Sequence, residues 1–95
     1  MLHDKEASVL MEEGYMRIHI EYTNQESRSF ICDTIGEVEL EMDVHPEVIH
    51  RRLDKEGGGT FSVEFSGEDY ICTRTSGEFI EKLLKRLHIK KCEYL

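Results

Sequence analysis

The strongest local pattern in the chain is a strict alternation of acidic and apolar residues over positions 37–44. Val38, Leu40, Met42 and Val44 occupy one set of alternate positions, and acidic residues occupy the other set. Successive side chains of a β-strand point to opposite faces, so a period of two is typical of a strand with one buried face. The segment therefore predicts a half-buried antiparallel strand with a solvent-facing row of carboxylates: Glu37, Glu39, Glu41 and Asp43.

Other segments of the chain also have the periodicity of strands or helices. Shorter stretches rich in alternating apolar residues predict strands over 15–22, 28–32, 60–66, 69–75 and 89–94. A short helix is predicted over 4–13, and a second helix from Pro46 to the glycines at 57–59. The clearest helix begins with the capping box Thr75–Glu78 and has an apolar stripe of Phe79, Ile80, Leu83, Leu84 and Leu87.

Strands and helices in this order, without regular β-α-β alternation, predict an α+β fold. Ninety-five residues form one small domain, so we expect a single domain over 1–95. The predicted architecture is an antiparallel sheet of about five strands with two or three helices on one face. Residues 1–14 are expected to contribute a short helix that frays.

Charge and cysteine content exclude several classes of protein. Twenty acidic and 12 basic residues give a net charge of −8, which argues against a duplex nucleic-acid binder. No apolar run approaches the ~20 residues of a membrane span, and the acidic N-terminal residues do not resemble a signal peptide. Cys32, Cys72 and Cys92 are an odd number without a C-x-x-C motif, as expected for reduced thiols. We therefore expect a soluble cytoplasmic protein.

The basic residues are concentrated near the C-terminus. Residues 82–91 carry a net charge of +5, whereas residues 1–81 carry −12. Cations are favourable at the C-terminal end of a helix, and a basic cluster can also form a surface for a partner. The three basic residues placed on the predicted helix are Lys82, Lys85 and Arg86.

Motifs for catalysis or metal binding are absent from the sequence. The five histidines have neither zinc-site spacing nor an H-E-x-x-H motif, and no EF-hand loop or G-x-S-x-G motif occurs. The three glycines at 57–59 lack the lysine of a phosphate-binding loop, so they are interpreted as a linker or as a turn that needs a positive φ. We therefore predict no enzymatic activity, no catalytic residue, no cofactor and no metal ligand.

The stretch from Gly67 to Leu84 resembles the last hairpin and C-terminal helix of frataxins. The matching residues are Gly67-Glu68-Asp69-Tyr70-Ile71-Cys72, Arg74, Ser76-Gly77-Glu78-Phe79 and Leu83-Leu84. This resemblance implies iron binding by carboxylates and a partner in iron–sulfur assembly. The chain has no Trp, where that family uses several, and it lacks the family's long acidic N-terminal helix.

The function predicted from these features is a small acidic interaction module that binds another macromolecule, with a protein as the expected partner. Its carboxylate row would steer a basic partner, and a nearby apolar patch would supply affinity. The row could also be a solvated sheet face or could collect hard cations. Alternatives are a nucleic-acid-contacting subunit that uses 82–91 or a carboxylate-based metal-binding domain, and a homodimer is left open. The predicted partner-binding residues are Glu37, Glu39, Glu41, Asp43, Lys82, Lys85 and Arg86.

Overall fold

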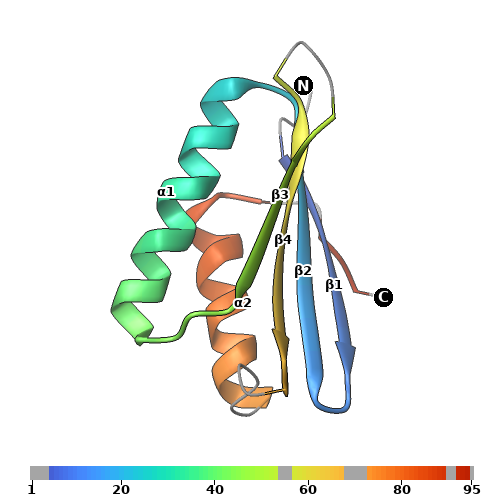
Figure 1. The fold of residues 1–95 in the computed structure, drawn as a ribbon, viewed down its shortest axis with the longest axis vertical. Coiled ribbons are helices and arrows are strands. Elements are labelled where there is room, and N and C mark those ends of the chain that lie inside the picture. Colours follow the sequence, from blue (N-terminus) through green and yellow to red (C-terminus); the bar gives the residue numbers. More distant parts are fainter. Residues whose placement is uncertain (1–4, 54–56, 68–72, 90–91, 95) are drawn as a thin grey trace.

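The structure, a computed structural model, describes residues 5–53, 57–67, 73–89 and 92–94. Within these residues the chain forms a five-stranded mixed sheet with two helices on one face (Figure 1). The elements, in chain order, are β1 (Lys5–Glu12), β2 (Tyr15–Tyr22), α1 (Gln25–Met42), β3 (Glu47–Arg52), β4 (Gly59–Ser66), α2 (Thr73–Arg86) and β5 (Cys92–Tyr94). The predicted α+β class is thereby confirmed.

The strand order across the sheet is β3-β4-β2-β1-β5. Neighbouring strands are antiparallel except for β5, which runs parallel to β1, so the sheet is mixed and not wholly antiparallel. β1 and β2 are joined by a tight turn in which Gly14 has a φ of 73°. None of the described helices is both long and apolar enough to cross a membrane.

The core lies between the sheet and the two helices. The alternation predicted for 15–22 is confirmed, because every second residue of β2 is buried on the helix side. Phe65 of β4 meets Phe79 of α2 edge to face, with ring centroids 5.2 Å apart. The buried apolar side chains of the three central strands are Ala7, Val9, Met16, Ile18, Ile20, Tyr22, Phe61, Val63 and Phe65.

The prediction of strands over 28–32 and 37–44 is wrong, because both segments belong to helix α1. The side chains that α1 buries are Ser27, Ile31, Thr34, Ile35 and Val38, which recur at helical spacing. Two of these five are hydroxyl residues, whereas the apolar Leu40 is 81% exposed. Helix α1 is therefore only weakly amphipathic, and its alternating acidic residues have the period of two that is typical of a strand.

Both ends of α1 are fixed by local hydrogen bonds. The Asn24 side chain caps the first turn by accepting a 2.8 Å hydrogen bond from the Ser27 N–H. Inside the helix, the Thr34 hydroxyl donates to the Phe30 carbonyl at 2.7 Å. Asp43 ends the helix with a left-handed φ of 53°.

Two predicted helices are strands. The predicted helix over 4–13 is wrong, because β1 pairs with β2 along its whole length and buries Ala7 and Val9. The predicted helix after Pro46 is also wrong, because β3 pairs with β4, and Val48 lies opposite Val63. Short segments with weak helical patterns thus adopt the conformation that completes the sheet.

The predictions of the last helix and the last strand are confirmed. Helix α2 is confirmed, although it begins at Thr73, before the predicted capping residue Thr75. It buries the expected Phe79, Ile80 and Leu83, whereas the expected Leu84 is only partly buried. Leu87, directly after the last residue of α2, is also buried. Strand β5 lies within the predicted 89–94. The strand predicted over 69–75 is wrong at 73–75, which are helical, and its remaining part lies outside the described residues, as does Glu68 of the predicted hairpin turn.

Candidate functional site

The four acidic residues predicted to line a strand do not form a row. They lie on and just after α1, where successive residues turn by about 100° around the axis. Glu37 is exposed, Glu39 is half-buried, and Asp43 is exposed at the helix end. The predicted carboxylate-lined strand at these positions is therefore corrected to a helix whose acids point in several directions.

Glu41 connects the two helices. Its Oε1 accepts a hydrogen bond from Lys82 Nζ at 3.0 Å, and its Oε2 accepts one from Arg86 Nη2. These hydrogen bonds lower the pKa of the Glu41 carboxyl group. The structure thus joins one predicted acidic residue to two predicted basic residues of the same chain, while Lys85 stays exposed.

This contact predicts a pH-dependent contribution to stability. Because the pKa of Glu41 is lowered below its usual 4.5, the charged contact stabilises the fold above that pH and is lost as the pH falls through the lowered value. We expect Glu41→Gln to reduce the melting temperature slightly at pH 7, and the two melting temperatures to converge at low pH. The exposed Glu37→Gln is the matched control and should leave the melting temperature unchanged. A difference that is independent of pH would contradict this assignment.

Two other acids of the segment, Glu39 and Asp43, lie near His45. The Nδ1 atom of His45 lies 3.7 Å from Glu39 Oε2, and its Nε2 lies 3.6 Å from Asp43 Oδ1. A wide, open depression on the outer side of α1 includes His45 and Glu39. It is lined by Cys32, Asp33, Gly36, Glu37, Glu39, Leu40 and His45.

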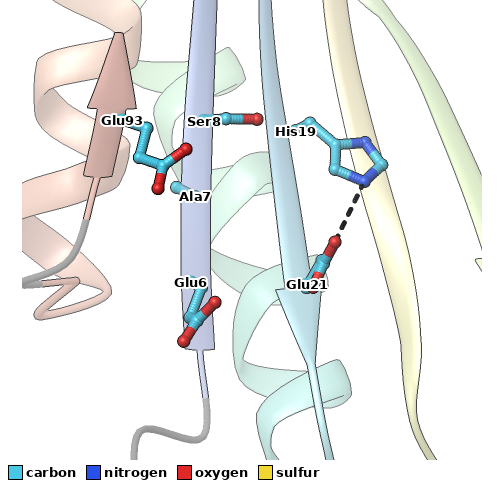
Figure 2. Close-up of a pocket in the computed structure, with 6 residues that line it drawn as sticks. All are labelled: Glu6, Ala7, Ser8, His19, Glu21 and Glu93. Atoms are coloured by element: carbon cyan, nitrogen blue, oxygen red, sulfur yellow. Dashed lines mark ion pairs between the residues drawn. The ribbon is translucent and has the colours of Figure 1, made fainter.

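A more enclosed hollow lies on the opposite side of the molecule, on the sheet face that the helices leave open (Figure 2). In one cross-strand row, Ser8 of β1 pairs with His19 of β2 and with Glu93 of β5. Because Ser8 is small and both neighbours are long, a hollow of about 140 Å³ remains above it. Glu6 and Glu21 form the next row and close one end.

Negative charge is concentrated at this hollow. Glu6 lies directly opposite Glu21 in the β1–β2 register, and Glu93 adds a third carboxylate from β5. Like charges directly opposite each other are unfavourable in a sheet. The three carboxylates together attract a cationic ligand to this face of the sheet.

His19 lies at the side of the hollow. Its Nδ1 and the Ser62 hydroxyl form a 2.9 Å hydrogen bond, and its Nε2 lies 4.0 Å from Glu21 Oε1 (Figure 2). The order serine, histidine, acid resembles a nucleophilic relay, but 4.0 Å is too long for a hydrogen bond. β2 and β4 are also internal strands, so the ladders use their N–H groups and none can stabilise an oxyanion. The geometry suits the binding of charge better than acyl transfer at Ser62.

Comparison with known proteins adds no relative. No protein-family model matches the chain, and neither curated proteins nor solved structures give a match. The resemblance to frataxins therefore rests only on the residues quoted for it. Within the described parts of the chain, no group of three or more His, Cys, Asp or Glu side chains is arranged to hold a metal ion.

Sequence reasoning missed the sheet hollow, although part of its signal was present. The alternation over 15–22 already places His19 and Glu21 on one face of a strand. Their neighbours could not be identified, because β1 was predicted as a helix and a helix has no cross-strand partners. The contribution of Glu93 depends on the parallel β1–β5 pairing, which no local pattern indicates.

Proposed function

We propose that this chain is a non-enzymatic protein-binding module whose open sheet face receives a basic side chain of its partner. The observation that carries the proposal is the hollow above Ser8, where carboxylates from three strands surround a small residue. A lysine ammonium or arginine guanidinium would complement this charge, and arginine would add directed hydrogen bonds.

The size and surroundings of the hollow support this choice of ligand. Sites for drug-sized molecules usually enclose about 300–1,000 Å³. At about 140 Å³, the hollow suits the end of a single side chain. Half-buried Leu10 lies in the next row of the same sheet face and offers apolar contact beside the hollow. The net charge of −8 would attract a basic partner from a distance.

The partner is still expected to be a protein, as predicted from the sequence. The proposed contact lies at the hollow above Ser8 instead of at the residues predicted from the sequence. Glu37, Glu39 and Asp43 lie on or beside α1, which covers the opposite face of the sheet. Lys82 and Arg86 already bind Glu41. These residues and Lys85 remain candidates for a separate contact, and the experiment below distinguishes the two surfaces.

The test is an NMR titration of ¹⁵N-labelled protein with a capped Gly-Arg-Gly peptide, with Gly-Glu-Gly as the control peptide. We expect the arginine peptide to shift the amide signals of Ser8, His19 and Glu93. Glu21→Gln and Glu93→Gln should each weaken binding by about two- to fivefold, since one partly exposed charge pair contributes up to ~1 kcal/mol.

Glu37→Gln is the matched control, because it removes the same charge from the outer side of α1. It should leave the affinity for the arginine peptide unchanged. Shifts centred on Glu37 and Leu40 would instead assign binding to α1. Equal shifts with both peptides, or no shifts, would reject the proposed site.

A further inference from the structure

The edge strand β3 differs from the other strands in its exposure. All six of its residues are exposed, including the apolar Val48 at 38% and Ile49 at 36%. β3 forms one end of the sheet and pairs only with β4 among the described elements. In Figure 1 no described helix or strand is drawn in front of it. An edge with exposed apolar residues is a template for pairing with another strand.

The hydrogen bonds to β4 identify which backbone groups of β3 point outward. The Leu53 N–H donates to the Gly58 carbonyl at 3.0 Å, so Leu53 directs its backbone groups toward β4. Backbone direction alternates along an antiparallel strand, so Glu47, Ile49 and Arg51 also face β4. The N–H and C=O groups of Val48 and His50 therefore point away from the sheet.

We infer that the chain forms a homodimer in which β3 pairs antiparallel with β3 of a second copy, with Ile49 opposite Ile49 at the two-fold axis. In this register Val48 and His50 exchange backbone hydrogen bonds with His50 and Val48 of the second copy. The two sheets then join into one continuous sheet with all helices on the same side.

The side chains of β3 are self-complementary in this register. On the open face, Glu47 of each copy lies opposite Arg51 of the other, so two ion pairs flank the central Ile49 contact. These positions are non-hydrogen-bonded pairs, in which the Cα atoms approach to about 4.5 Å and side chains are closest. A shift of one residue would place Ile49, whose backbone groups face β4, opposite His50, whose backbone groups face outward, so the two strands could not exchange hydrogen bonds.

Two further observations favour a second copy at this edge. Val48 and His50 lie on the helix side of β3 and are exposed, so neither helix extends over the edge. Among the five described strands, only β3 carries more basic than acidic residues, so two acidic molecules repel each other least along it.

His50 is held in place without adding charge to the edge. Its ring stacks on Phe61 with centroids 4.3 Å apart, and its Nε2 lies 2.5 Å from Tyr22 Oη. Burial, together with the nearby Arg28 and Arg52, lowers the pKa of His50 below its usual 6.5. The lowered pKa favours the neutral ring, so His50 adds little positive charge beside Arg51 and Arg52.

The test is sedimentation velocity at increasing protein concentration with charge-reversal variants. We expect the wild type to dimerise with a Kd on the order of 10–100 µM, because a six-residue strand buries less area than a standard interface. Glu47→Arg alone and Arg51→Glu alone should each weaken the dimer at least about tenfold, since each places like charges opposite one another twice. An equimolar mixture of the two variants should form a heterodimer, because every opposed pair is then arginine with glutamate.

Two more variants complete the test. Ile49→Lys should prevent dimerisation and preserve the circular-dichroism spectrum, because Ile49 is exposed and makes no core contact. Glu37→Arg is the matched control on α1 and should leave the dimer unchanged. A wild type that is monomeric at about 1 mM, far above the expected Kd, would overturn the inference. A dimer insensitive to Ile49→Lys, or two variants that fail to associate when mixed, would also overturn it.

Discussion

Replacing Gly59 with alanine should destabilise the protein by about 3 kcal/mol, because the added methyl group has no space. A Cβ atom at this position would overlap the Arg51 carbonyl oxygen and lie 2.8 Å from Tyr22 Cζ. The carbonyl belongs to the β3 backbone and cannot rotate away, so β3 or Tyr22 must shift. Urea denaturation, followed by far-UV circular dichroism, measures the loss.

Gly36→Ala is the control, because it adds the same methyl group where no atom lies within 4 Å. Gly36 lies inside α1, where alanine is favoured over glycine by about 0.5–1 kcal/mol. The two substitutions should therefore change the free energy of unfolding in opposite directions. Equal stability of wild type and Gly59→Ala would contradict the close pairing of β3, β4 and β2 at this point.

A second large effect is expected at Val38, where aspartate should unfold the protein. Val38 is fully buried between α1 and the sheet, and an unpaired carboxylate there has no compensating partner. The cost should exceed about 4 kcal/mol, which is comparable to the whole stability of a small domain. The measurement is the far-UV spectrum of the purified variant, together with its urea midpoint if it folds.

Leu40→Asp provides the matched comparison two positions away. Leu40 is 81% exposed, so the same substitution should cost only about 1 kcal/mol, through lower helix propensity and an unfavourable charge near the helix end. In a strand over 37–44, Val38 and Leu40 would share one buried face, and both substitutions would be equally damaging. Equal and severe effects would therefore restore the strand and contradict helix α1.

The elements predictable from the sequence were those whose local pattern matches their environment. Every second residue of β2 and β4 is buried, and α2 buries a stripe that recurs at helical spacing. In these segments one face contacts the core and the other contacts water. The pattern of apolar residues in each segment therefore indicates by itself which side chains are buried. The α+β class followed from these elements.

Helix α1 and strands β1 and β3 were decided by tertiary structure. Helix α1 buries the hydroxyls of Ser27 and Thr34 and exposes Leu40, so its periodicity is concealed. β1 and β3 have weak patterns of their own, and pairing with β2 and β4 fixes their conformation. Their backbone hydrogen bonds are satisfied only when those neighbours are present.

The residues that meet at the candidate site were also decided by tertiary structure. The sequence by itself determined the acidity of the chain and placed His19 and Glu21 on one face of a strand. The tertiary structure decided that Ser8 lies between His19 and Glu93, because the register of β1 with β2 and with β5 brings them into one row. Cross-strand neighbours depend on which strands pair and in what register, and that choice minimises the free energy of the whole sheet instead of any single segment.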